Sequence, residues 1–320
     1  MSRGLSEECP DAPSPNSVGG LHTAPFRRPR FRRPVLLVVS LVLAGFAALS
    51  VHVGLLAAGA PFPQPRPPVW AQWLNEAFIV GALLAILKLA QPDFGQLNTP
   101  TRAIILFVIM AMVQETLRAA FMTGVVTGGW GYSALGLVKP LLRAFTVALL
   151  CVLALRWVQG IFSLLIVAVA IAALSMVVRR IVSQAVDPLL QHFAWLARAD
   201  MYSFPYPFHV TVAAYLSFAE AVAGSLLLTM LVWDQLPASR PVRLLVLAVL
   251  VALVKGVVGS TLFYSYFTGE SVLLGIISWS QFLLEFLVLG ALVGLAWAAF
   301  GRQCMPLDGD DNARSRRPVA

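Results

Sequence analysis

Charged side chains are scarce in this chain: Asp, Glu, Lys and Arg together make up 12% of its 320 residues, whereas 59% of the residues are hydrophobic. A soluble domain usually carries about 25% charged residues, because its surface must be hydrated. The scarcity therefore excludes an ordinary soluble fold. A mean hydropathy of +0.81 instead indicates a protein that works within a membrane.

Cysteine and histidine are also rare, and the usual catalytic motifs are missing. The three cysteines, Cys9, Cys151 and Cys304, form no CxxC pair, so the sequence supports neither a disulfide framework nor a zinc site. The four histidines are scattered, and no HExxH or GxSxG motif occurs. We therefore expect no cofactor, no metal and no enzymatic activity.

Basic residues exceed acidic ones and give a net charge of +8, which raises the question of nucleic-acid binding. The excess lies beside the apolar region, in residues 27–33 and 314–317. Clusters of basic residues next to a membrane span orient helices and contact anionic lipid head groups. No soluble domain is left to bind a nucleic acid, so we expect membrane lipids as partners and no nucleic acid.

What the chain does have is a succession of apolar runs. About 20 apolar residues cross a bilayer core as a helix, and several runs reach that length. The sequence thus predicts an all-α, polytopic transmembrane helix bundle of about eight spans. The predicted spans are 34–59, 70–90, 103–126, 136–157, 160–178, 208–233, 242–265 and 272–300.

The arginine distribution predicts the orientation of these spans. Cytoplasmic loops carry an excess of Lys and Arg, and the arginine-rich start of the chain should therefore be cytoplasmic. Eight spans return the C-terminus to the same side, so we expect a multi-pass protein of the cell membrane, an inner membrane, with both termini cytoplasmic. The expected regions are a disordered tail at 1–33, transmembrane halves at 34–157 and 158–300, and a second disordered cytoplasmic tail at 301–320.

One loop disagrees with this orientation, because Arg179, Arg180 and Arg198 fall on the outer side. Residues 180–200 alternate apolar and polar positions at helical spacing, with Pro188 within the pattern. The pattern predicts an amphipathic helix that lies in the membrane interface. The alternative is a cytoplasmic extension of the fifth span.

The two halves resemble each other. Pro61-Phe62-Pro63 reappears 144 residues later as Pro205-Tyr206-Pro207, and the same offset places Glu76 on Glu220. The offset then falls to 141, at which Pro100 and Arg102 match Pro241 and Arg243. We interpret this as a parallel tandem repeat of two four-helix halves, an arrangement that places transporter sites between the halves.

Ionisable residues within predicted spans are the candidates for function. Each costs about 2.5–3.5 kcal/mol at the bilayer centre, so such residues persist when they pair, face a cavity or function. Glu115 and Arg118 lie three residues apart and are expected to pair within their helix. Lys255 has no acidic neighbour at helical spacing and should pair with Glu220 or Glu285.

Glu76 and Glu220 occupy matching positions, where they could bind a cation, relay protons or join helices by hydrogen bonds. Arg143 is expected only to extend towards the outer surface. The predicted substrate or proton path comprises Glu76, Glu220, Lys255, Glu285, Glu115 and Arg118. Whether these charges are structural pairs or a functional path stays open.

Two functions remain after these exclusions. The first is a transporter or flippase-like permease for a small or lipid-linked solute, which should have a hydrated cavity bordered by Glu76, Glu220 and Lys255. The second is a non-catalytic membrane subunit that anchors or assembles an envelope biogenesis or secretion complex. That subunit should have those charges paired and dry, with a groove of small residues for a membrane protein partner.

Overall fold

The computed structural model describes residues 33–63, 66–196, 204–269 and 271–301, and every regular element in these ranges is a helix. The helices are α1 (Pro34–Ala57), α2 (Val69–Leu89), α3 (Gln91–Phe94), α4 (Thr99–Val113), α5 (Thr116–Thr127), α6 (Trp130–Gly136), α7 (Val138–Ala154), α8 (Ile161–Gln191), α9 (Phe208–Ser217), α10 (Ala219–Val232), α11 (Arg240–Lys255), α12 (Val257–Phe263) and α13 (Val272–Ala296). Short 3₁₀ segments extend α7 to Trp157, α10 to Gln235 and α12 to Phe267, and a π-helical turn extends α13 to Gly301.

Local sequence explains where several helices begin. Proline lies in the first turn of α1, α4 and α11, where its missing N–H costs no helical hydrogen bond. The Asn98 side chain accepts a hydrogen bond from the Thr101 N–H at 2.9 Å and so caps α4. Ser271 caps α13 in the same way, through the Leu274 N–H.

Within the described residues, six helices are long and apolar enough to cross a membrane, and the number rises to eight if each of two bent helix pairs is one span. The bent pairs are α4 with α5, which meet at 43°, and α11 with α12, which meet at 71°. The structure thus confirms an all-helical architecture suited to a multi-pass membrane protein, with six to eight candidate spans.

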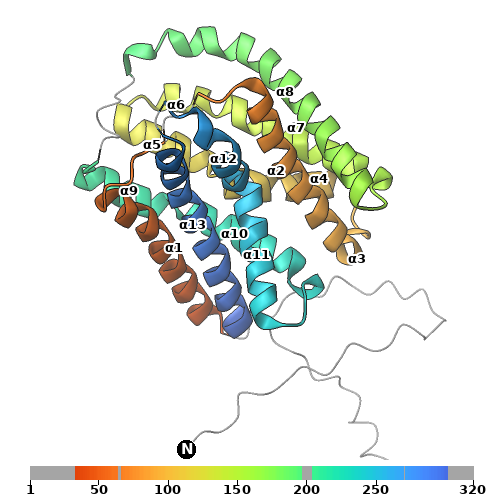
Figure 1. The fold of residues 1–320 in the computed structure, drawn as a ribbon. Helices are drawn as coiled ribbons and strands as arrows, with labels where there is room; N and C mark the ends of the chain where they lie inside the picture. Colours follow the sequence, from red (N-terminus) through yellow and green to blue (C-terminus); the bar gives the residue numbers. More distant parts are fainter. Residues whose placement is uncertain (1–32, 64–65, 197–203, 270, 302–320) are drawn as a thin grey trace, which may run out of the picture.

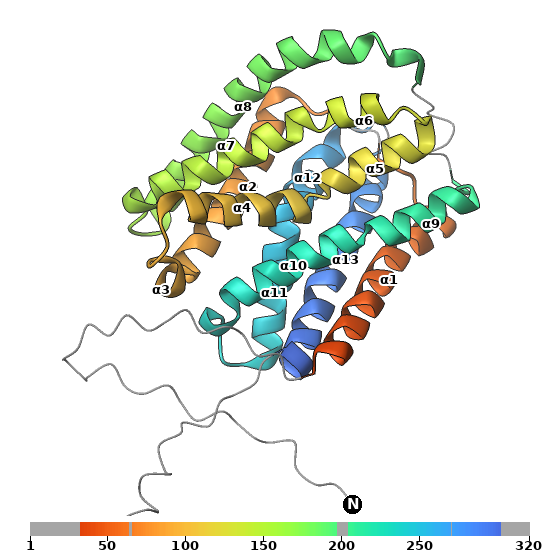
Figure 2. The same cartoon turned by 180° about the vertical axis from the view of Figure 1, so that it is seen from behind.

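The helices pack so that the first and the last lie together. Helix α1 packs along α13, and α8 packs along α2 and α7 on the opposite flank of the molecule (Figure 1). Figure 2 shows the other side, where α4 and α10 cross between these flanks. The interior is apolar around Leu83, Phe218 and Phe286, while Val35, Phe162 and other apolar side chains face outward. An apolar exterior of this kind suits contact with lipid.

The segment predicted to be an interfacial helix belongs to α8, which runs unbroken from residue 161 to residue 191 and curves over one end of the bundle (Figure 1). Ile181 and Leu189 are exposed, whereas Asp187 forms an ion pair with Lys139 of α7. The segment is therefore a continuation of the fifth apolar run rather than a separate element. Residues 197–200 and the predicted tails 1–32 and 302–320 lie outside the described residues.

Candidate functional site

The first bent pair breaks at a glutamate. Helix α4 ends at Val113 and α5 begins at Thr116, and Glu115 between them adopts a left-handed conformation with φ of 58°. It is the one residue other than glycine with a positive φ among the described residues. This conformation costs an ordinary residue about 1–2 kcal/mol. Strain of this kind persists where surrounding contacts enforce it, and it marks candidate functional sites.

The second bent pair breaks at Gly256, which has φ of 86°. Glycine adopts this conformation without strain because it lacks Cβ. A Cβ at this position would also lie 2.8 Å from Cδ1 of Ile79. Lys255 is the last residue of α11, so the break places its side chain at the junction of the two helix segments.

Glu115 joins the two breaks. One of its carboxylate oxygens accepts a hydrogen bond from Arg118 and the other accepts one from Lys255. Glu115 is 7% exposed. The Lys255 ammonium also lies 3.4 Å from the backbone oxygen of Gln114 and 4.6 Å above the ring of Phe286. The buried carboxylate is thus shared by two cations from different helices.

Glu220 occupies the N-terminus of α5. Its two carboxylate oxygens accept hydrogen bonds from the backbone N–H groups of Leu117, at 3.0 Å, and Arg118. The first N–H groups of a helix have no partner within the helix and carry partial positive charge, so this position favours an anion. A carboxylate from α10 therefore fills an anion site that the break in the α4–α5 pair creates.

Gln114 links this cluster to a second one. Its amide nitrogen donates to the Val254 oxygen at 3.1 Å, and its amide oxygen accepts from Arg143 at 3.1 Å. Arg143 of α7 also donates from Nε to both oxygens of Glu76, each at 3.1 Å, in a forked ion pair. Ser175 of α8 donates to the same carboxylate at 2.8 Å.

These contacts form one continuous chain across the bundle, which we call the central polar network. It draws on α2, α4, α5, α7, α8, α10 and α11, and contains Glu76, Gln114, Glu115, Arg118, Arg143, Ser175, Glu220 and Lys255. Its three glutamates balance its two arginines and one lysine. Glu76 and Glu115 are buried and the other four charged residues are half-buried, and all six charges are thereby neutralised within the protein.

Glu285 is a fourth carboxyl group beside this network. It lies on α13, is 2% exposed, and is electrostatically influenced by Glu115, Arg118 and Lys255. Each cation of the network is hydrogen-bonded to another glutamate. Glu285 therefore adds an acidic group that is not required to balance the network.

The structure places every predicted site residue in or beside the network. Two predictions are wrong: the partner of Lys255 and the role of Arg143. Lys255 pairs with Glu115 rather than with Glu220 or Glu285. Glu115 and Arg118 do pair as predicted, although the pair lies at a helix break rather than within a helix. Arg143 does not extend to the outer surface, because its guanidinium pairs with Glu76.

Sequence reasoning missed Ser175 and undervalued Gln114 and Arg143. A serine in an apolar helix gives no signal by itself, and the pairing of Glu76 with Arg143 joins residues 67 positions apart on different helices. Among the described residues, no group of three or more His, Cys, Asp or Glu side chains is placed to hold a metal ion. Comparison of the chain with protein-family models, with curated proteins and with solved structures finds no match in any of the three.

Proposed function

We propose that this protein is a membrane permease whose substrate path runs through the central polar network. The observation that carries the proposal is the meeting of two broken helices at a buried, charge-balanced cluster. Transporters commonly bind their substrates near the bilayer midplane, where broken helices expose backbone groups. Burying an ion pair is costly, so apolar residues at these positions would give a helix bundle that is at least as stable. The presence of the charges therefore favours a functional role over a purely structural one.

We also propose that the chain is a tandem duplication, which would favour a permease. The breaks at Glu115 and Gly256 lie 141 residues apart, which is the offset at which Pro100 and Arg102 match Pro241 and Arg243. Arg102 donates from Nε to the Leu97 oxygen at 2.7 Å, and Arg243 donates from Nε to the Pro237 oxygen at 2.8 Å. Matching residues thus anchor the loops that precede α4 and α11.

The helix packing follows the same correspondence. The repeat would match α1 to α8, α2 to α10, α4 to α11 and α7 to α13. Under this correspondence, each principal helix contact in one half has a counterpart in the other. Helix α1 packs on α13 as α8 packs on α7, and α4 packs on α7 as α11 packs on α13. Helix α4 packs on α10 as α11 packs on α2. Such an exchange would be expected if a pseudo-twofold axis related the two halves, as in a parallel repeat.

In the proposed mechanism, the protein's own carboxylates occupy the substrate site in the closed state. Glu220 fills the N-terminus of α5, and Glu115 neutralises Arg118 and Lys255. An acidic group of a small or lipid-linked solute would take the place of Glu220 at the α5 N–H groups. The two halves would then move about the breaks.

Accessibility of the break from each side of the membrane tests this mechanism. The variant C9S/C304S/T116C places one thiol beside Glu115, at a site that is 4% exposed. We expect a membrane-impermeant maleimide to label it in both right-side-out and inverted vesicles, because a permease opens to each side in turn. The added mass of the purified protein measures the labelling.

Cys151 provides the control within the same chain, because it is fully buried on α7. It should stay unlabelled in C9S/C304S vesicles of either orientation. Size-exclusion chromatography of the purified variant checks that it remains folded. Labelling of the introduced thiol from one side only, or from neither side, would contradict the permease mechanism.

The orientation belongs to the same proposal. Basic side chains gather at the end where α1 begins and α13 ends, and the Arg33 N–H bonds to the Phe300 oxygen there. This end also holds the helix termini that carry Lys88, Arg102, Arg156 and Arg240. The positive-inside rule makes it cytoplasmic. Alkaline phosphatase fused after Ala320 should therefore be inactive, and an active fusion would reverse the orientation.

A second candidate, an anchoring subunit of a membrane complex, is favoured by a groove between α1 and α13. The groove has a volume of about 440 Å³ and is lined largely by small and aliphatic residues, among them Ala44, Ala47 and Ala296. Small residues allow close helix packing in membranes. Its occupant would be a single transmembrane helix of a partner. A partner retained by the wild-type protein and lost by the variant A47W would support this candidate.

A further inference from the structure

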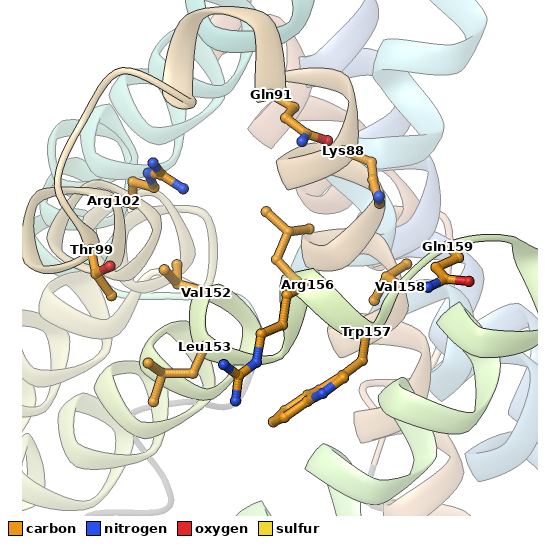
Figure 3. A pocket seen from close by; sticks show the side chains of 11 residues that line it. Lys88, Gln91, Thr99, Arg102, Val152, Leu153, Arg156, Trp157, Val158 and Gln159 are labelled. Atoms are coloured by element: carbon orange, nitrogen blue, oxygen red, sulfur yellow. The ribbon is translucent and has the colours of Figure 1, made fainter.

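A large cavity lies outside the central polar network, at the end of the bundle where α2 and α7 finish. It has a volume of about 820 Å³ and opens between the end of α2, the start of α4 and the segment after α7. Figure 3 shows Lys88, Arg102 and Arg156 around the opening, each from a different one of these elements.

The charge of this cavity has one sign. None of its lining residues is acidic, and no carboxylate pairs with Lys88, Arg102 or Arg156 within the described part of the chain. Arg102 uses two of its five N–H groups to hold the Leu97 and Gly95 oxygens. The remaining donors, with the Lys88 ammonium and the Arg156 guanidinium, form a site for an anion with several oxygen atoms.

The rim of the cavity indicates which kind of anion fits. Trp157 and Leu153 line it and are 56% and 49% exposed, and the neighbouring Phe162 is 80% exposed. The Arg156 guanidinium lies 4.5 Å above the Trp157 ring. A charged cavity that continues into an exposed apolar face matches an amphiphile, and tryptophan is typical of the depth at which lipid head groups lie.

The proposed repeat matches this place to the surroundings of Trp233 in the second half. Trp233 is 7% exposed and packs between Arg243, whose Cζ lies 5.1 Å from the ring, and Gly294. Under the 144-residue offset, Trp233 takes the position of Leu89, next to Lys88. The second half therefore has a buried indole ring next to the position that matches Lys88.

We propose that this cavity binds the phosphate-bearing head group of an anionic glycerophospholipid, with the acyl chains lying along the exposed face of α7 and α8. Basic pockets between transmembrane helices bind such head groups by this chemistry. The proposal requires the cavity to lie at a membrane surface and is independent of substrate transport. It would stand if the permease mechanism failed.

Native mass spectrometry of the purified protein tests the site. Dioleoyl phosphatidylglycerol and dioleoyl phosphatidylcholine are titrated separately into wild type, K88Q, R156Q and K88Q/R156Q. We expect wild type to retain phosphatidylglycerol in preference to phosphatidylcholine. Each single substitution should weaken phosphatidylglycerol binding about fivefold and the double substitution about 25-fold, because each cation near the surface contributes a similar attraction.

R33Q is the matched control, since Arg33 is an exposed arginine at the same end of the bundle but outside the cavity. It should bind phosphatidylglycerol as wild type does. Thermal unfolding of K88Q/R156Q in detergent confirms that the variant is folded. Equal binding of both lipids, or unchanged binding by K88Q/R156Q, would overturn the proposal. Inorganic phosphate that displaces the lipid at an equal concentration would overturn the lipid assignment in favour of a free phosphate site.

Discussion

The two helix breaks differ in angle, 43° against 71°, and in chemistry. In the first half a glutamate adopts the left-handed conformation, and its carboxylate holds two cations. In the second half a glycine adopts that conformation without strain, and the preceding residue, Lys255, supplies one of those cations. The first break therefore combines a carboxylate with a strained backbone, whereas the second combines an unstrained backbone with a counter-charge. Two bent spans can thus share one ion pair while each supplies a different part of it.

The largest effect should come from breaking the ion pair that joins the two breaks. E115Q leaves Arg118 and Lys255 without a buried counter-charge, and we expect it to lower the free energy of unfolding by about 3–5 kcal/mol. The double variant E115Q/K255M should recover part of that loss, because one uncompensated cation is removed. Thermal unfolding in detergent of the two singles and the double measures the coupling.

Glu285 supplies the control for this cycle. E285Q combined with K255M should show much weaker coupling than E115Q with K255M, because Lys255 is hydrogen-bonded to Glu115 and not to Glu285. Additivity between E115Q and K255M, with coupling between E285Q and K255M instead, would show that the pairing across the breaks is wrong.

The second break is tested by adding a side chain. G256A forces alanine into φ of 86° and brings its Cβ to 2.8 Å from Cδ1 of Ile79. We expect G256A to lower the free energy of unfolding by about 2–3 kcal/mol, because of the left-handed backbone and the steric overlap together. G54A is the matched control, because Gly54 lies in α1 with nothing within 4 Å of an added Cβ. It should be neutral or slightly stabilising in thermal unfolding.

The strain at the first break can be isolated once the charges are removed. In the K255M background, we expect E115G to be more stable than E115Q by about 1 kcal/mol, because glycine accepts the left-handed conformation that glutamine resists. The same thermal unfolding assay gives the difference. If E115Q/K255M proves the more stable variant, Glu115 is not strained and the two breaks do not differ in that respect.

The smallest effect should come from Glu220, the counterpart of Glu76 in the proposed repeat. E220Q keeps an amide oxygen that can accept hydrogen bonds from the α5 N–H groups, so we expect it to lower the free energy of unfolding by about 0.5–1 kcal/mol. E76Q should lower this free energy several times more, because Arg143 is left without its buried partner. Equal losses in unfolding measurements would mean that the two glutamates have equivalent roles.

The sequence predicted the helical bundle well because hydropathy reports the length of each apolar run directly. The predicted spans 70–90 and 272–300, for example, coincide closely with α2 and with α13 and its last turn. It could not predict the break at Glu115, because glutamate has no intrinsic preference for a left-handed backbone. The pairing of Lys255 was wrong for the same reason: the break directs the Glu115 carboxylate towards α11, away from the position that an unbroken helix would give it.

Partners on different helices were the other limit. Spacing along one helix identifies neighbours three or four residues apart, which is why Glu115 with Arg118 was predicted. It carries no information about which helices lie side by side. Arg143 and Glu76 were therefore assigned separate roles, although they form a forked ion pair. The charged residues within the predicted spans could be selected from the sequence as a group. Which of them pair with one another could be known only from how the helices pack.

The position of α1 has a consequence for how the chain is made. The main partners of α1 are α13, α10 and α9, all of which are synthesised later, and 215 residues separate Ala57 from Val272. At about 5–20 residues per second, ribosomes need roughly 10–40 s to produce that length. During this interval the small-residue face of α1, around Ala44 and Ala48, is exposed to the bilayer because α13, which covers it, has not yet been made. The packing of the first helix is therefore completed only when α13 has been made, and a chain cut before α13 would leave α1 without its main partner.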